Sequence, residues 1–242
     1  MTVEIVVYNI ASALKAQEGG ADRVELCDNP GEGGTTPSYG MIRMAREKTN
    51  LQLYPIIRPR GGDFLYSDDE FRMMMHDIQM CKEIGCEGVV IGLLKPDGTI
   101  DGLRTAKLVN AAYPMGVTFH RAFDRTIDPF EALEDIIEIG CERILTSGQR
   151  PTALEGANLI KQLLGHANGR IIIMPGSGVR ADNVIDLAEK TNAVEFHTSA
   201  RKVIPNKMDY KNPEMNESLD IISVDADEVT KIARQLSHLK SS

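Results

Sequence analysis

Short apolar runs alternate with amphipathic stretches along nearly the whole of this 242-residue sequence. The runs are rich in β-branched residues, as buried strands are, and the amphipathic stretches repeat their apolar residues with the period of a helix. A strand followed by a helix therefore recurs as one unit. Parallel strands joined by helical crossovers build either a closed barrel or an open sheet, so the pattern predicts an α/β fold.

The sequence predicts eight such units. The strands are expected at Val3–Tyr8, Arg23–Cys27, Gln52–Ile57, Glu87–Gly92, Gly116–His120, Arg143–Gly148 with its closing turn, Ile171–Met174 and Ala193–Phe196. The helices are expected at Ile10–Glu18, Ser38–Glu47, Asp68–Ile84, Ile100–Ala112, Pro129–Gly140, Ala153–Leu164, Ala181–Lys190 and Glu228–Leu239. Residues 203–227 are polar and without periodicity, which predicts a long loop on the carboxyl face that is a lid, an interface arm or partly disordered.

Polar motifs follow nearly every predicted strand. An open sheet concentrates such motifs at one switch point, whereas a barrel gathers them from all its strands at the carboxyl-terminal mouth. We therefore predict a single-domain (β/α)8 TIM barrel over residues 1–242, with a doubly wound open sheet as the alternative.

Charged residues alternate with apolar ones in the second predicted strand, Arg23–Cys27. Its two aliphatic side chains should face the covering helices, which leaves Arg23, Glu25 and Cys27 facing the barrel interior. Buried charges persist when they are paired, so Arg23 is expected to form an ion pair with a neighbouring strand. Glu25 lies nearer the end of the strand and belongs either to this scaffold or to a site.

An imidazole, a guanidinium and a carboxylate follow the fifth strand within Gly116–Asp124. Thr118 and His120 should point inward, because successive strand side chains face opposite sides. His197 follows the eighth strand in the same way. Because the carboxyl ends of barrel strands meet at one mouth, His120, Glu25 and His197 are candidates for proton transfer.

Two loops have the chemistry of an anion site. Two guanidiniums flank a proline and two glycines in Arg58–Phe64, where they either clamp a carboxylate or phosphate or pair with nearby acidic residues. The loops after the seventh and eighth strands of such barrels frequently bind phosphate, although a glycine turn there can also be purely structural. The expected anion-binding residues are Arg58, Arg60, Gly176, Ser177, Gly178 and Ser199.

Composition and net charge limit the kinds of partner that the protein is expected to bind. A net charge of -8 and a pI near 5.2 argue against nucleic acid or an anionic membrane as the main partner. No apolar run approaches the roughly 20 residues of a membrane span, and the N-terminus lacks the pattern of a signal peptide, so we expect a cytoplasmic protein. The four cysteines are scattered and expected to be free thiols. Met73 and Met80, on the outward face of one helix, together with the long segment after Arg201, predict a homodimer or larger homo-oligomer.

Five motifs carry a resemblance to a known family. They are Gly20–Cys27, Arg58–Phe64, Thr118–Asp124, Leu145–Gly148 and Glu195–Ala200. In this order, from about Val3 to Arg201, they closely resemble the CutC family, named for copper homeostasis. The resemblance implies a TIM-type barrel, a cytoplasmic location and a role in copper handling or copper binding.

Two classes of function therefore remain open. The first is a copper-binding protein in which Cys27, His120 and His197 supply thiolate and imidazole ligands to Cu(I). The second is an enzyme of lyase or isomerase type, which uses acid and base groups on a small anionic or phosphorylated substrate. The residue types at the strand ends favour the enzyme, whereas the family resemblance favours copper.

Overall fold

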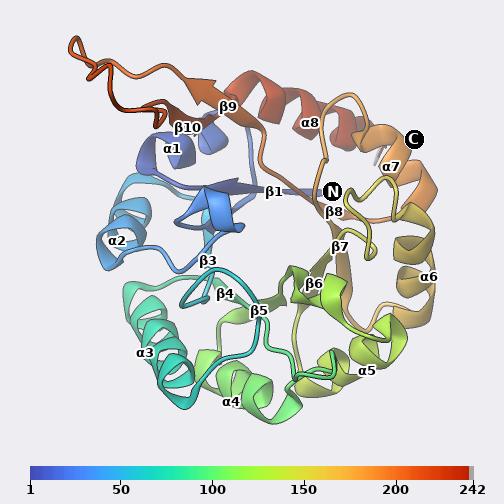
Figure 1. The fold of residues 1–242 in the computed structure, drawn as a ribbon. Helices are drawn as coiled ribbons and strands as arrows, with labels where there is room; N and C mark the ends of the chain where they lie inside the picture. The colour runs from blue at the N-terminus through green and yellow to red at the C-terminus, as the bar shows by residue number, and fades with distance from the viewer. Residues whose placement is uncertain (240–242) are drawn as a thin grey trace.

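The predicted strands form a parallel barrel that helices surround on its outer side (Figure 1). The computed structural model describes residues 1–239. The barrel strands are β1 (Thr2–Val7), β2 (Arg23–Leu26), β3 (Gln52–Pro55), β4 (Gly88–Ile91), β5 (Gly116–Phe119), β6 (Arg143–Thr146), β7 (Ile172–Pro175) and β8 (Glu195–Thr198). The helices are α1 (Ile10–Glu18), α2 (Tyr39–Lys48), α3 (Asp68–Ile84), α4 (Gly102–Ala112), α5 (Pro129–Ile139), α6 (Ala157–Ala167), α7 (Val184–Thr191) and α8 (Ala226–Leu239), with short 3-10 turns η1 (Pro30–Glu32) and η2 (Arg121–Arg125).

The barrel closes from two halves of four strands, ordered β3-β2-β1-β8 and β4-β5-β6-β7, with parallel pairing throughout. The backbone N–H of Ile57 donates to the carbonyl of Val90 over 2.8 Å and joins the halves between β3 and β4. At the other seam β7 lies beside β8 (Figure 1), and the Thr198 hydroxyl donates to the carbonyl of Val179 over 2.6 Å. The predicted closed barrel is confirmed, and the open-sheet alternative is wrong.

Aliphatic and polar residues separate onto the two faces of the strands. Outward side chains such as Ile5, Val24 and Phe119 join the large apolar layer beneath the helices and are fully buried. Burying one such side chain stabilises the fold by about 1.5–3 kcal/mol. This layer holds the strands rigidly, so that inward and strand-end side chains keep fixed positions.

Several helices begin later in the structure than predicted, and in one case a local cap decides where the helix begins. The helix expected from Ile100 begins at Gly102, since the Asp101 carboxylate accepts a hydrogen bond from the backbone N–H of Arg104. The helices expected from Ala153 and Ala181 begin at Ala157 and Val184. None of these shifts moves a strand end.

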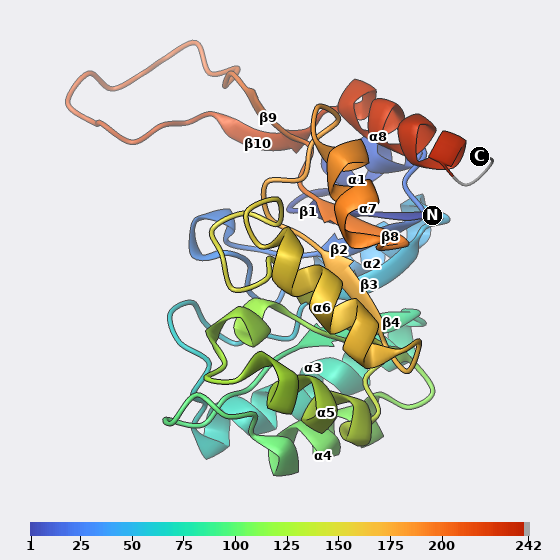
Figure 2. The same cartoon turned by 90° about the vertical axis from the view of Figure 1, so that its right-hand side faces the viewer.

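The prediction of an irregular loop at 203–227 is partly wrong. The segment includes most of an antiparallel hairpin of β9 (Arg201–Ile204) and β10 (Ile221–Val224), and it reaches the start of α8. Its outer part projects from the body of the barrel (Figure 2). The base is tied to α1, where the Asn9 side-chain amide donates to the carbonyl of Ile222 over 2.9 Å. The β-branched residues of the two strands pair, which the polar composition around them concealed. We call residues 201–224 the arm.

The outward face of α3 carries only one of the two methionines expected there. Met73 is exposed, whereas Met80 is partly buried against the apolar layer. No helix in the described part of the chain is long and apolar enough to cross a membrane.

Candidate functional site

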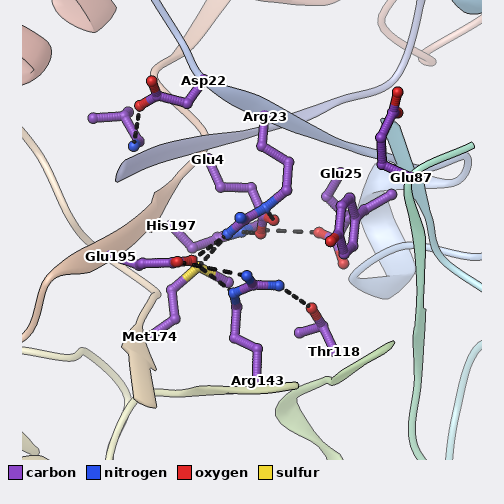
Figure 3. A network of polar contacts seen from close by, with 12 residues as sticks. Glu4, Asp22, Arg23, Glu25, Glu87, Thr118, Arg143, Met174, Glu195 and His197 are labelled. Atoms are coloured by element: carbon purple, nitrogen blue, oxygen red, sulfur yellow. Dashed lines mark hydrogen bonds and ion pairs between the residues drawn. The ribbon is translucent and has the colours of Figure 1, made fainter. Parts of the chain in front are cut away.

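A network of buried charges crosses the barrel interior (Figure 3). Arg23 forms ion pairs with Glu4 of β1 and with Glu195 of β8, the latter at 2.6 Å. Arg143 of β6 reaches the same Glu195 oxygen at 2.6 Å and donates to the Thr118 hydroxyl over 3.0 Å. The predicted internal ion pair of Arg23 is confirmed, and it extends over five strands because alternating residues of each strand face inward.

His197 joins this network through Glu4, and both His197 and Glu25 line the cavity at the barrel mouth. His197 Nδ1 lies 2.7 Å from a Glu4 oxygen, and Nε2 lies 3.8 Å from a Glu25 oxygen, so the imidazole stands between two carboxylates (Figure 3). Burial opposes protonation of His197, but its hydrogen bond to Glu4 and the charge of Glu25 raise its pKa. Glu4 thereby orients the ring toward the cavity.

The pKa values of the two carboxyl groups beside His197 are shifted in opposite directions. Burial raises the pKa of Glu25 to about 7, although the positive charge of His197 opposes this rise. Glu4 is equally buried, yet the hydrogen bond from His197 and the charge of Arg23 outweigh that burial and hold its pKa at about 2. A pair of carboxyl groups with separated pKa values is typical of acid and base chemistry. Of the two carboxyl groups, Glu25 is therefore the one that can gain or lose a proton near neutral pH.

The mouth of the barrel encloses a cavity of about 1260 Å³. Its wall is formed by the loops that follow the strands, and the strand-end residues Glu25, His120 and His197 all line it. The sequence-based expectation that these three side chains meet at the carboxyl end of the barrel agrees with the structure. Catalytic residues of barrels of this kind lie at this end.

Positive charge predominates on the cavity wall despite the acidic composition of the chain. Seven lining residues are basic and four are acidic. The basic ones are Arg58, Lys95, Arg121, Arg125, Arg150, Arg180 and Arg201, and the acidic ones are Glu25, Glu32, Asp63 and Asp124. Asp124 is occupied by the loop after β6, where it accepts from the backbone N–H of Ser147 over 3.0 Å and pairs with Arg121. The cavity is therefore suited to an anion.

The predicted anion-binding residues fall into two groups. Ser177, Gly178 and Ser199 line the cavity, as does Arg58, although Arg58 is buried and its guanidinium donates to the backbone carbonyls of Glu32, Gly34 and Gly62. Arg58 therefore holds the loops of the mouth together and also contributes positive charge to the cavity wall.

Arg60 and Gly176 lie outside the cavity wall. Arg60 turns away to Glu70, at 2.6 Å, and Asp63, at 2.8 Å, which is the alternative that its acidic neighbours had suggested. Gly176 is buried where β7 meets β8, and a Cβ there would come within 3.2 Å of the His197 Cβ. Neither residue forms part of the cavity wall.

The proposed copper ligands are not arranged as one ligand set. The Cys27 thiol is buried, a Cβ at Gly34 would lie 3.1 Å from its sulfur, and Cys27 is absent from the cavity wall. Burial, then the charge of Glu25, raises the pKa of this thiol well above its ordinary value, which opposes the thiolate that a metal requires. Residues 1–239 contain no cluster of three or more histidine, cysteine, aspartate or glutamate side chains that could hold a metal ion.

Sequence reasoning missed Glu4 and Arg180. Glu4 was part of a continuous apolar strand, and the same alternation that was applied to Arg23 and Glu25 would have placed it inside the barrel. Arg180 lies two residues beyond Gly178 and has no side-chain hydrogen bond or ion pair within residues 1–239. Only the folded loop shows that it reaches the cavity.

Comparison with known proteins gives a consistent result. The model of the CutC family matches residues 1–202. A family protein CutC from Chromobacterium violaceum is 54% identical over 209 residues, which are 86% of this chain and 85% of that protein. One from Xylella fastidiosa is 48% identical over 236 residues, 97% of this chain and 88% of the other.

Solved structures agree with the barrel. A structure from Streptococcus agalactiae, described as a candidate copper homeostasis protein CutC, has a TM-score of 0.79 and 33% identity over 82% of this chain and 98% of that one. A phosphoribosyl anthranilate isomerase from Thermotoga maritima has a TM-score of 0.61 with 14% identity, over 98% of this chain and 99% of that one. The second likeness concerns the fold alone.

Proposed function

This chain belongs to the CutC family, and we propose that it is an enzyme that transfers a proton on a small anionic substrate at the mouth of its barrel. The observation that carries the proposal is the Glu4–His197–Glu25 array beneath a cavity lined mainly by basic residues. Proton transfer requires a base whose pKa lies near neutral pH, which a second group positions and a pocket exposes to substrate.

The role of each group follows from its charge and its position. Glu25, whose pKa is raised to about 7 by burial, accepts or donates the proton. His197 stays oriented by Glu4 and stabilises negative charge on Glu25. Arg180, with Ser177 and Gly178 beside it on the cavity wall, holds the anionic group of the substrate through charge-assisted hydrogen bonds.

The anion site gives a direct prediction. Phosphate, sulfate and sugar phosphates screened by thermal shift and calorimetry should include binders of the wild-type protein. Arg180→Ala should weaken that binding by about tenfold to a hundredfold, since a hydrogen bond to a charged group contributes about 1.5–3 kcal/mol. Arg170→Ala is the matched control, because Arg170 pairs with Glu134 on the outer surface. Equal affinities in both variants would contradict an anion site at Arg180.

Copper handling is a second candidate function, favoured by the description of the related Streptococcus agalactiae structure. Cu(I) suits thiol and imidazole ligands, and His120 Nε2 has no hydrogen-bond partner within the described residues. Anaerobic Cu(I) titration against a competing chelator tests this in wild type, Cys27→Ser and His120→Leu. Unchanged affinity in both variants would remove Cys27 and His120 from any copper site.

We propose that the protein acts in the cytoplasm as a homo-oligomer. Its four cysteines are free and buried, which fits a reducing compartment. The arm and its loop expose Val203, Met208, Tyr210, Met215, Leu219 and Ile221. Exposed apolar side chains concentrated on one projecting segment are typical of a subunit contact.

Shortening the arm tests this assembly. A variant in which Asn-Gly replaces residues 205–220 keeps the paired strands and should be a monomer by light scattering at micromolar concentration, whereas the wild type should be a dimer or larger. Met73→Glu is the control, because Met73 lies on α3, the other surface that was expected to form a subunit contact. A wild type that is monomeric would refute the assembly, and a shortened variant that stays assembled would place the contact elsewhere.

A further inference from the structure

The hydrogen bonding of His120 determines which of its ring nitrogens carries the proton. The backbone N–H of Ala122 donates to His120 Nδ1 over 3.1 Å at the start of η2. A backbone N–H can only donate, so Nδ1 presents its lone pair, and the neutral ring must carry its proton at Nε2. The local fold of the loop after β5 thus fixes one tautomer.

The Nε2–H group so defined has no partner. It is buried and makes no hydrogen bond within the described part of the chain, although the His120 ring lines the cavity. His120 itself is 4% exposed. A buried donor without a partner is unusual in a folded protein and is often explained by a functional role.

Three neighbours set the position and charge of the ring. The centroid of the Phe64 ring lies 5.1 Å from that of His120, and Phe64 also lines the cavity. A Cβ at Gly92 would lie 2.3 Å from His120 Nδ1, so glycine at this position makes room for the imidazole. Burial, and then the charge of Arg58, lower the pKa of His120 to about 3. With Nδ1 accepting from the Ala122 N–H and Nε2 carrying the proton, the neutral ring offers a substrate a donor and no free lone pair, which favours Glu25 over His120 as the base.

We propose that His120 donates a hydrogen bond from Nε2–H to a carbonyl or enolate oxygen of the substrate, and that Phe64 covers this donor in the free protein. This inference rests on the proposed proton-transfer function and names its substrate class, a small anion with a carbonyl group. Phe64 follows Gly61 and Gly62, which allow its loop to move the ring aside when substrate enters.

The resulting step divides the chemistry between two groups. The C–H bond next to the carbonyl breaks, and its proton forms an O–H bond with the ionised Glu25 carboxylate. The electron pair of that bond moves into the new C–C double bond, and the carbonyl electrons move onto oxygen. The enolate oxygen accepts the hydrogen bond from His120 Nε2–H, which strengthens as negative charge develops. Return of the proton from Glu25 to carbon restores the carbonyl, so the step is a reversible enolisation that needs no other reactant.

The tautomer is tested by NMR of the protein with 15N-labelled histidine. His120 should show a protonated Nε2 and an unprotonated Nδ1 that do not change between pH 5 and pH 9. His197 in the same spectrum serves as the internal comparison, since its hydrogen bond with Glu4 favours protonation. A His120 ring that titrates in this range, or that carries its proton at Nδ1, would overturn the proposal.

The donor role is tested with phosphoglycolate, which combines a phosphate with a carboxylate that resembles an enediolate. His120→Leu, which lacks a donor, should bind it about tenfold to a hundredfold more weakly than wild type, whereas His120→Gln, which keeps an N–H donor, should lose much less. Gly92→Ala should displace the His120 ring and so weaken binding, although the residue at position 120 is unchanged. Circular dichroism and thermal unfolding establish that each variant is folded.

The outcomes separate this inference from the proposed function. If phosphoglycolate binds wild type and His120→Leu equally, the donor role is wrong while the anionic pocket stands. If it does not bind wild type at all, the proposed substrate class fails and the donor role fails with it. Selective weakening in His120→Leu and Gly92→Ala, together with the expected tautomer, supports both.

Discussion

Replacing Arg143 by methionine is expected to lower the free energy of unfolding by about 3–5 kcal/mol, because removal of one partner leaves an uncompensated charge in the barrel interior. Arg143 is 1% exposed, lies 2.6 Å from Glu195 and donates to the Thr118 hydroxyl. Urea denaturation of the variant and the wild type at pH 7 measures the difference. Glu195 keeps only Arg23 as a partner in the variant, so the change is not a simple loss of packing.

A surface ion pair provides the control. Arg170 makes two contacts with Glu134, at 2.7 and 2.6 Å, but both side chains are partly exposed. Arg170→Met should therefore lower stability far less than Arg143→Met does, because solvent screens an exposed ion pair. In the interior, the double variant Arg143→Met with Glu195→Met should cost less than the sum of the single variants, because the two charges leave together. Equal losses at the buried and exposed sites would contradict this account of the network.

Replacing Glu25 by glutamine is expected to have two opposite effects, a loss of turnover and a gain of stability at alkaline pH. The amide cannot take up a proton from the substrate, and removal of such a base lowers turnover by about a hundredfold to ten-thousandfold. The stability effect arises because Glu25 is buried and its pKa is raised to about 7 in the folded protein from an ordinary value of 4.5. A gain in stability that accompanies a loss of activity distinguishes a functional group from a structural one.

The sign of the pH dependence follows from this shift. A carboxyl group with a raised folded pKa contributes stability that is fully present below its unfolded pKa and is lost as pH rises through its folded pKa. The wild type should therefore lose stability relative to Glu25→Gln between about pH 4.5 and pH 8, by a total on the order of 3 kcal/mol. Chemical denaturation at pH 5, 6, 7 and 8 measures this difference.

Glu4→Gln is the matched comparison, since Glu4 is equally buried and contacts the same histidine. Its folded pKa of about 2 lies below the ordinary value, so its ionised form stabilises the protein above about pH 4.5, and that contribution is lost as pH falls toward 2. Glutamine at this position should therefore lower stability at neutral pH. A Glu25→Gln variant that is destabilised at pH 8 would show that the carboxylate there is structural.

The barrel and the position of its mouth follow from local patterns in the chain. Alternation in strands such as Arg23–Cys27 depends only on the period of an extended chain, so it placed Arg23 and Glu25 inside without knowledge of their partners. The recurring βα unit fixed parallel neighbours, and parallel strands bring their carboxyl ends to one edge. Glu25, His120 and His197 could therefore be assigned to one mouth from their positions at strand ends.

What each of these groups can do depends on contacts that form only in the folded chain. The partners of His197 come from β1 and β2, and the Arg58 charge that lowers the pKa of His120 comes from the loop after β3, so their protonation depends on distances that no local pattern encodes. Arg60 and Arg58 are two residues apart in sequence, yet one turns to Glu70 outside the cavity and the other lines it. Residue type and position in the strand follow from the chain, whereas charge state and partner follow from contacts between strands distant in sequence.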